Sequence, residues 1–260
     1  LDAVQEGCSR IILAIGGSST NDGGMGALTA LGVKFLNENN GVLTGIGENL
    51  NKIQSIDTNN VIKNLNNIEI IIASDVNNPL YGPEGAAFIY GPQKGANGND
   101  VVFLDKGLMH FSQVIEQKIG RKIDVIPGAG AAGGIGAGLY GFFNAKITSG
   151  LQLIVELLHF EEEIKASQLV ISGEGKIDKQ TLYGKVISGI FNLCQKYQKP
   201  LILLAGKVED EAYSIYGDKV LALFSIVNGP MHEKEAILKA SYLLEKTSYN
   251  IAKLLFHHFV

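Results

Sequence analysis

The sequence has only two cysteines among its 260 residues and no tryptophan. Cys8 and Cys194 are too few for a disulfide framework and lack the spacing of metal ligands, so they predict two buried thiols in a reducing cytoplasm. An excess of positive charge is also missing, because the net charge is −4. The chain therefore lacks the electrostatic signature of a nucleic-acid-binding protein, and we expect no nucleic-acid partner.

Signals for secretion and membrane insertion are missing as well. The first ten residues include Asp2, Glu6 and Arg10 and have neither the basic nor the apolar region of a signal peptide. One uncharged run, residues 125–145, is long enough to cross a bilayer, but it contains Pro127 and seven glycines and is too weakly hydrophobic. We expect a cytoplasmic protein with no membrane partner.

Hydrophobic residues make up 46% of the sequence, and 32 residues are glycine. The hydrophobic content is enough for a sizeable core, and the glycines cluster in loops, which excludes collagen. Apolar β-branched runs alternate with helical patterns, which is typical of an α/β fold with largely parallel or mixed sheets. The predicted strands cover residues 10–15, 68–73, 168–171, 200–205 and 220–226, and the predicted helices cover residues 23–31, 100–119, 131–143, 151–164, 184–197 and 233–256.

The composition predicts two α/β domains. Residues 37–67 are rich in Asn, Gly and Thr, which indicates loops and short elements, and the composition changes near Ala166. We therefore predict a glycine-rich-loop domain at residues 1–166 and a Rossmann- or flavodoxin-like domain at residues 167–260. The chain begins without methionine or a helix N-cap, so we expect a preceding segment.

The first loop with chemical potential follows the first predicted strand. Glycines allow a ligand close to the backbone, hydroxyls add donors, and the N–H groups at the next helix N-terminus favour anions. Asp22 suits either a metal ligand or a helix cap, and a tight turn with such a cap explains the loop equally well. The candidate residues are Gly16, Gly17, Ser18, Ser19, Thr20, Asn21 and Asp22.

The second loop follows the second predicted strand. Asp75 at the end of that strand suits a general base or a Mg²⁺ ligand. Asn77 follows it, and Lys94 lies among turn residues from which it could meet a carboxylate or phosphate. An Asx turn and a solvated lysine are the structural alternatives.

The third loop contains Gly128, Gly130 and Gly133, which match the G-x-G-x-x-G pattern. The preceding residues are a poor strand and the nearest acid, Glu156, falls inside a predicted helix, so a dinucleotide site is weakly supported. A phosphate-cradling turn and close packing that only small residues permit are both left open.

The fourth loop is predicted after the strand that ends at Ser172-Gly173. It contains Glu174, Lys176 and Asp178, followed by Thr181. This density of charge beside glycine favours a functional site over a solvated turn. Several motifs are absent, among them the G-x-x-x-x-G-K-[ST] phosphate loop, C-x-x-C, H-E-x-x-H and G-x-S-x-G.

Five segments together resemble the glycerate kinases of the bacterial class I type. They are residues 15–24, 74–80, 90–96, 127–134 and 172–178, the last followed by Gln180-Thr181 and Gly184-Lys185. The resemblance covers essentially the whole chain. It implies two α/β domains and phosphorylation of D-glycerate with ATP and Mg²⁺.

The resemblance also implies roles for the candidate residues. Asp75, then Asp178 and Glu174, are the candidate catalytic carboxylates, and Asp75 or Asp178 is the candidate Mg²⁺ ligand. Lys94 and Lys185 are candidate cations for phosphate or for the glycerate carboxylate. Which loop takes ATP, which hydroxyl is phosphorylated and the oligomeric state are left open.

Two departures from the family pattern concern the active site. The family has a further N-terminal segment with an Asp-Ser-Phe-Lys motif, and the resemblance implies that this segment completes the second domain. The family also usually has Arg where Lys176 stands, and the lysine here keeps the charge but loses the bidentate fork of Arg. A chain without that segment could be an inactive fragment. The alternatives to a kinase are a non-catalytic nucleotide- or anion-binding relative and, more weakly, a dehydrogenase that uses the third loop.

Overall fold

The computed structural model describes residues 1–178, 181, 185–216 and 219–256. The chain forms two compact units, Leu1–Leu153 and Ile154–Val260. Both combine helices with parallel sheets, which confirms the predicted α/β class. The division lies upstream of the predicted boundary at 166/167, because Ile164 packs into the core of the second unit.

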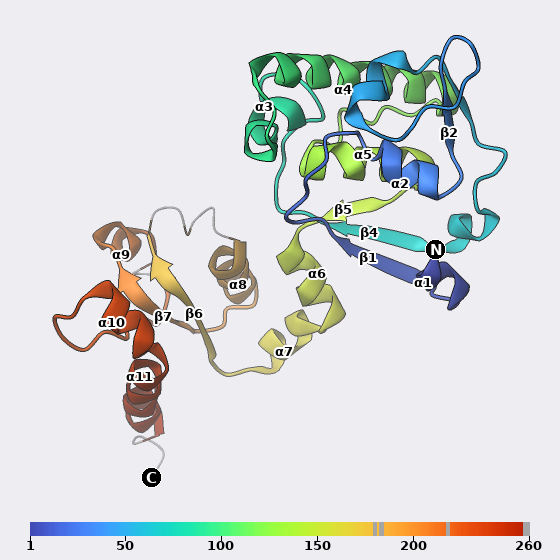
Figure 1. Cartoon of the computed structure of the whole chain (residues 1–260). Coiled ribbons are helices and arrows are strands. Elements are labelled where there is room, and N and C mark those ends of the chain that lie inside the picture. The colour runs from blue at the N-terminus through green and yellow to red at the C-terminus, as the bar shows by residue number, and fades with distance from the viewer. Residues whose placement is uncertain (179–180, 182–184, 217–218, 257–260) are drawn as a thin grey trace. The chain divides into compact units, whose positions relative to one another are not determined.

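The first unit is built on a parallel sheet of order β1-β4-β5 (Figure 1). Its strands are β1 (Arg10–Ala14), β4 (Glu69–Ala73) and β5 (Lys146–Thr148). Ala73 pairs with Ala14 on one side and with Thr148 on the other. The three strands therefore end at one edge of the sheet, which is where α/β folds place their ligands.

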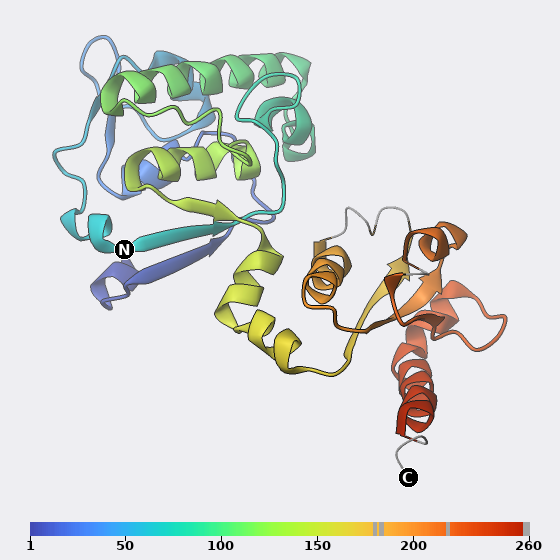
Figure 2. The same ribbon diagram turned by 180° about the vertical axis from the view of Figure 1, so that it is seen from behind.

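Helices cover this sheet in layers. Figures 1 and 2 show α2 and α5 between the sheet and α4. Phe35 and Phe111 are fully buried in the core, with ring centroids 5.9 Å apart. The remaining elements of the unit are α1 (Asp2–Gln5), α2 (Met25–Ala30), β2 (Lys34–Leu36), η1 (Gly47–Lys52), β3 (Ser55–Asp57), η2 (Lys63–Asn67), α3 (Ala86–Tyr90), η3 (Pro92–Lys94), α4 (Gly98–Ile119), η4 (Ala131–Gly134) and α5 (Ile135–Phe143).

The glycine-rich run at residues 131–143 is not one continuous helix. Ala132 and Gly133 have φ angles of 52° and 73°, so α5 begins only at Ile135. In the part of the chain that the structure describes, every helix is too short or too polar to cross a bilayer. Cys194 is buried as predicted, but Cys8 is exposed after a short N-terminal helix, so that prediction was wrong.

The second unit has a parallel sheet of order β6-β7-β8 with helices on both faces. Leu201 and Leu203 pack on one face against Ile190 and Tyr216, while Ile202 and Leu204 pack on the other face. The elements are β6 (Val170–Ile177), β7 (Leu201–Val208), β8 (Ala222–Ser225), α7 (Phe160–Ala166), α8 (Lys185–Lys196), α9 (Asp210–Tyr216), α10 (Glu233–Leu238) and α11 (Ala240–Phe256), and α6 (Gly150–Leu157) crosses the division between units.

Three sequence predictions in this part need correction. Strand β6 does not stop at Ser172-Gly173 but continues to Ile177, because it pairs with β7 as far as Ile177 with Val208. Glu174 and Lys176 are therefore strand residues and not loop residues. The predicted helices at 151–164 and 233–256 are each divided in two, the first at His159, whose φ is 50°.

Glu69 connects all three strands of the first sheet. Its carboxylate lies on the central strand and accepts hydrogen bonds from Arg10 of β1 at 2.6 Å and Lys146 of β5 at 2.7 Å. These bonds lower the pKa of Glu69, and the bond from Lys146 contributes most. A carboxylate with a lowered pKa stabilises the fold above its ordinary pKa, and this contribution is lost as pH falls through the lowered value.

We predict that Glu69→Gln lowers the midpoint of thermal unfolding at pH 7, by no more than about 3 °C because the pairs are solvent-accessible. The difference from wild type shrinks to zero in acid, where Glu69 is protonated in both states. Circular dichroism melts at pH 7 and near pH 3 measure this. An equal difference at both pH values would contradict the ionic origin.

Candidate functional site

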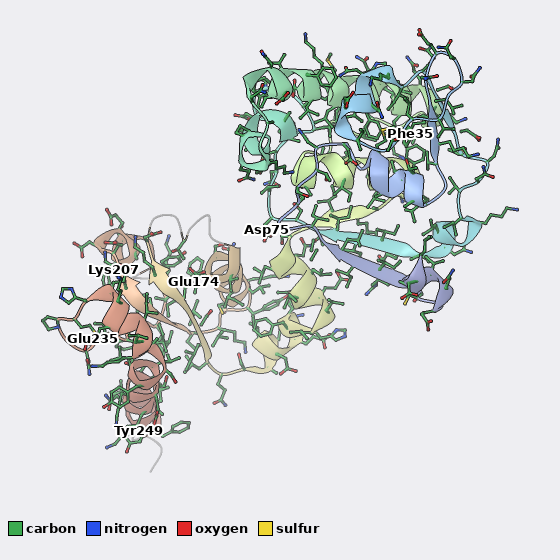
Figure 3. All side chains as sticks on the ribbon, in the orientation of Figure 1. Phe35, Asp75, Glu174, Lys207, Glu235 and Tyr249 are labelled. Atoms are coloured by element: carbon green, nitrogen blue, oxygen red, sulfur yellow. The ribbon has the colours of Figure 1, made fainter. Side chains whose placement is uncertain are left out.

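Three strand ends meet at the carboxyl edge of the first sheet. The segments that leave Ala14 and Ala73 begin side by side, because these two residues are paired. Asp75 lies at this edge (Figure 3), is exposed, and accepts the N–H of Gly150 through Oδ1 at 3.0 Å. The structure thus puts Asp75 at the expected end of its strand.

Asp22 organises the first loop. It is only 7% exposed, and its two carboxylate oxygens accept the N–H groups of Gly24 and Gly26, each at 2.9 Å. These N–H groups belong to the first turn of α2, whose dipole favours a negative charge there. Asp22 therefore acts as an anchor for the start of the helix.

Lys94 joins the second loop to the first. Its ammonium group donates to Ser18 Oγ at 2.9 Å and to the backbone oxygen of Thr20 at 2.6 Å. In the described part of the chain, no carboxylate forms an ion pair with Lys94. Partial burial lowers the pKa of Lys94, and the nearby charge of Asp22 opposes this shift. From the sequence we expected Lys94 only to meet a carboxylate or phosphate, and its contact with the first loop was not predicted.

The third loop packs against the first and second loops through backbone atoms. Gly133 accepts the N–H of Gly23 at 2.9 Å, and Gly130 donates to the backbone oxygen of Asn78 at 3.0 Å. A Cβ on Gly133 would lie 2.1 Å from the Thr20 oxygen, and one on Gly130 would lie 2.2 Å from the Pro79 oxygen. Only glycine permits these approaches, so the loop acts as a spacer that fixes its neighbours.

A cleft of about 280 Å³ opens beside Lys94. Asn21 lies in its wall, and both polar atoms of the Asn21 amide are buried with no hydrogen-bond partner among the described residues. A buried amide without a partner is costly, so this one needs explanation. The residues that line the cleft are Ser19, Thr20, Asn21, Asp22, Gly45, Ile46, Gly47, Glu48, Gly91, Lys94, Ala96 and Leu104.

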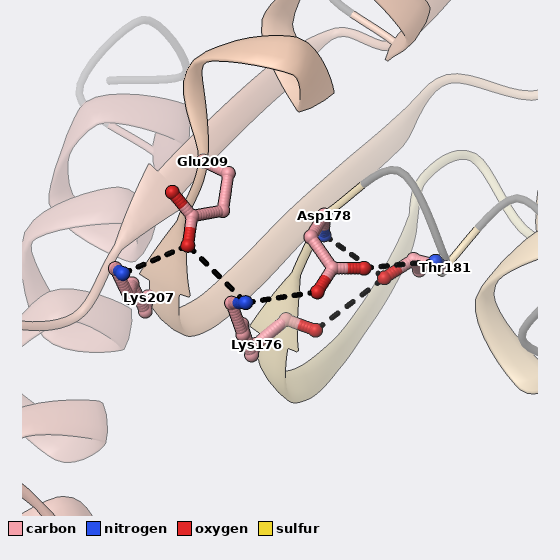
Figure 4. Close-up of polar contacts among 5 residues, drawn as sticks. All are labelled: Lys176, Asp178, Thr181, Lys207 and Glu209. Carbon is pink, nitrogen blue, oxygen red and sulfur yellow. Dashed lines mark hydrogen bonds and ion pairs between the residues drawn. The ribbon is translucent and has the colours of Figure 1, made fainter.

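The second unit carries a charged cluster at the ends of β6 and β7 (Figure 4). Lys176 Nζ lies 2.9 Å from Asp178 Oδ2 and 3.2 Å from Glu209 Oε1, and Lys207 Nζ lies 2.7 Å from the same Glu209 oxygen. These pairs raise the pKa of Lys176, with the largest contribution from Asp178. They lower the pKa of Glu209, with the largest contribution from Lys207. The two lysines are cross-strand neighbours that share one carboxylate.

Thr181 fixes the start of the loop after β6. Its hydroxyl accepts the N–H of Asp178 at 3.0 Å, and its own N–H donates to Asp178 Oδ1 at 3.2 Å. Thr181 is 4% exposed, so these bonds are shielded from water. Both oxygens of Asp178 are thus engaged, one by Thr181 and one by Lys176.

A family model described as the glycerate kinase family matches residues 1–256. The chain belongs to the glycerate kinase family. It is 42% identical to a glycerate kinase of Halalkalibacterium halodurans over 97% of this chain and 66% of that protein. It is 40% identical to the glycerate 2-kinase of Escherichia coli over 98% of this chain and 67% of that protein.

A solved structure leads to the same family. The chain matches a crystal structure described as glycerate kinase 2 from Salmonella typhimurium LT2 with a TM-score of 0.84 and 36% identity. The match covers 99% of this chain and 67% of that chain. The chain therefore spans about two thirds of the length of these glycerate kinase relatives.

In this member of the glycerate kinase family, some predicted site residues gather and others do not. Asp75 is not among the residues that line the cleft. Gly16, Gly17 and Asn77 are exposed outside it, and Gly128, Gly130 and Gly133 are buried beneath the loops. The predicted residues that do line the cleft are Ser19, Thr20, Asn21, Asp22 and Lys94.

The predicted residues of the second unit have different surroundings. Glu174 is half-buried on β6. The pKa of Tyr216 is raised mainly by the burial of Tyr216 and, to a smaller extent, by the nearby charge of Glu174. The Tyr216 hydroxyl is buried with no partner among the described residues. The Lys185 backbone starts α8, but its side chain lies outside the described residues, as do Gln180 and Gly184.

Sequence reasoning missed several site residues. Gly45, Ile46, Gly47 and Glu48 lie in a stretch with weak periodicity, although the alternate glycines were a usable signal of close approach. A Cβ on Gly47 would lie 2.6 Å from the Asn21 oxygen. Lys207 and Glu209 of the charged cluster were missed because β7 was predicted to end at residue 205, whereas it continues to Val208 and so includes Lys207 and ends just before Glu209.

Proposed function

We propose that the protein transfers the γ-phosphoryl group of ATP to a hydroxyl group of D-glycerate. Membership of the glycerate kinase family across residues 1–256 is the observation that carries this proposal. The half-buried Lys94 in a glycine-lined cleft supports it, because a cation that forms no ion pair with the described residues suits an anionic substrate.

For the proposed reaction the protein must position the two substrates, neutralise phosphate charge and supply a base. The glycerate hydroxyl oxygen attacks the γ-phosphorus, the bond to the bridging oxygen breaks, ADP leaves, and the hydroxyl proton passes to a base. Phosphoryl transfer depends mainly on positioning and on neutralising charge. We assign the base to Asp75 first, with Asp178 and Glu174 as the other carboxylates, and we assign phosphate neutralisation to Lys176 and Lys185.

Mg²⁺ fits this arrangement with few protein ligands. No group of three or more His, Cys, Asp or Glu side chains gathers among the described residues, and Mg²⁺ in kinases is usually held by one or two carboxylates with substrate phosphates. Asp75 at the strand edge or Asp178 would hold it. When bound, Mg²⁺ would neutralise phosphate charge.

The finer details of the proposal follow from the relatives and the composition. The name of the E. coli relative favours the 2-hydroxyl, which ³¹P NMR of the product would identify. Neither cysteine forms a disulfide, which favours a cytoplasmic protein.

ADP release with D-glycerate, ATP and Mg²⁺ tests the proposal. Because the chain spans about two thirds of its relatives, the assay compares the 260 residues with a form extended to the relatives' length. We expect glycerate-dependent ADP release by the extended form, at a turnover of about 1–100 s⁻¹ as in other kinases. If neither form releases ADP while both bind ATP, the protein is a non-catalytic nucleotide-binding relative and the proposal fails.

A further inference from the structure

The cleft beside Lys94 contains three charged side chains, and two of them, Asp22 and Glu48, are already bound by other groups of the protein. Asp22 has both carboxylate oxygens occupied by the N–H groups of Gly24 and Gly26. Glu48 is exposed and forms an ion pair with Lys52 at 3.2 Å. Lys94 has no ion pair within the described ranges, so it is the cleft's available charge.

The ammonium group of Lys94 also has a donor to spare. A lysine has three N–H donors, and the two acceptors of Lys94 are Ser18 Oγ and the Thr20 oxygen. Burial disfavours the charge of this lysine and its pKa falls accordingly. An anion in the cleft would accept the remaining N–H and restore part of the lost solvation.

The size of the cleft limits what the anion can be. Its volume of about 280 Å³ lies just below the range of about 300–1,000 Å³ that encloses drug-sized ligands. A three-carbon acid fits within it. One lysine also matches a single carboxylate, while a triphosphate needs several cations or a metal ion.

The remaining walls match the rest of such an acid. Ser19 and Thr20 line the cleft, and a side-chain hydroxyl group can both donate to and accept from a hydroxyl group of the substrate. Ile46 and Leu104 add an apolar side to the cleft.

From these observations we infer that the cleft holds the carboxylate of the hydroxy-acid substrate on Lys94, with the hydroxyl end toward Ser19 and Thr20. This inference rests on the proposed function and assigns to glycerate a loop that the sequence left open between glycerate and ATP. It makes Lys94 a specificity-determining residue for a carboxylate.

Substrate selectivity of Lys94 variants tests the assignment. The kcat/KM for D-glycerate and for its amide, glyceramide, is measured with wild type, Lys94→Met, Lys94→Arg and, as a control, Lys118→Met, an exposed lysine on α4. We expect Lys94→Met to lower kcat/KM for glycerate by about 10- to 100-fold, the value of a charge-assisted hydrogen bond, and to leave glyceramide and the KM for ATP within about threefold. Lys94→Arg keeps a charge and retains most of the preference for glycerate.

Two results would overturn the assignment. An increase in the KM for ATP that matches the loss with glycerate would put nucleotide in the cleft. Equal losses of kcat/KM with glycerate and glyceramide would mean that Lys94 only holds the first and second loops together.

Calorimetric titrations separate failure of this assignment from failure of the proposed function. D-glycerate and ATP are titrated separately into wild type and Lys94→Met. If wild type has no kinase activity but binds glycerate through Lys94, the assignment stands and the proposed reaction falls. If wild type is an active kinase whose glycerate binding ignores Lys94, the assignment alone falls.

Discussion

Gly133→Ala is expected to separate the loops that form the cleft. Gly133 has a φ of 73°, where an L-residue other than glycine is strained by about 1–2 kcal/mol. The new Cβ would also lie 2.1 Å from the Thr20 oxygen and 2.7 Å from the Asn21 Cα. These are backbone atoms, so the clash cannot be relieved by turning a flexible side chain.

The expected cost combines this strain with overpacking, which adds about 1–3 kcal/mol. We therefore expect Gly133→Ala to lower the free energy of unfolding by about 2–5 kcal/mol. Glycerate-dependent turnover should fall by at least about 10-fold, because Thr20 and Asn21 move with the loop. Urea unfolding and ADP release measure the two effects.

Gly98→Ala provides the matched control. Gly98 begins α4, has no positive φ, and a Cβ there would meet nothing within 4 Å. Alanine at such a position is neutral or slightly stabilising. If Gly133→Ala were as stable and active as Gly98→Ala, the backbone contact between the third and first loops would not matter for the site.

The sequence correctly predicted those elements whose pattern is complete within a short stretch of residues. The strand predicted at residues 10–15 is β1, Arg10–Ala14, because a β-branched run and the glycines after it define both its ends. The helix predicted at 100–119 begins only two residues earlier, at Gly98, since the side chain of Asn97 accepts the N–H groups of Asn99 and Asp100 there.

The elements that were wrong depend on partners distant in sequence. Gly-Glu-Gly-Lys after Ser172 has low strand propensity, and only the pairing with β7 extends β6 through it. A Cβ on Gly173 would lie 2.5 Å from the Leu204 oxygen, so the glycine that suggested a turn instead permits close strand packing.

The site was predicted as a set of loops but not as a cleft. The contacts of Lys94 with Ser18 and Thr20 join residues 76 and 74 positions apart, and no periodicity marks such a pair. Leu104 lies in the helix predicted at residues 100–119, and nothing local indicates that it also forms a wall of the cleft. Such contacts follow from tertiary packing, which a single sequence does not specify residue by residue.

Asp22→Ala is expected to have a comparably large effect, by a different route. Removal of the carboxylate leaves the N–H groups of Gly24 and Gly26 without their acceptors in a largely buried turn. An unsatisfied buried donor costs about 1–3 kcal/mol, so the free energy of unfolding should fall by about 2–4 kcal/mol. Asp57→Ala is the control, because Asp57 makes the same kind of bond, to the N–H of Asn59 at 2.9 Å, but in an exposed turn.

Asp22→Asn isolates the effect of the charge on Lys94. Asparagine keeps one acceptor oxygen, so more of the fold survives, but the negative charge that supports the Lys94 ammonium is lost. Burial already lowers the pKa of Lys94 and Asp22 opposes it, so this variant lowers that pKa further. Glu48, the other acid of the cleft, is paired with Lys52 and cannot substitute fully.

The pH dependence of kcat/KM for glycerate then shows in which direction the pKa of Lys94 has moved. Carboxylate binding needs a charged Lys94, so activity falls as pH rises through its pKa. In Asp22→Asn this alkaline fall should begin at a lower pH than in wild type, while the Asp57→Ala profile should overlay wild type. An alkaline limb that does not move, in a variant that remains folded, would mean that Asp22 supports only the helix start and that the charge of Lys94 is maintained by other groups.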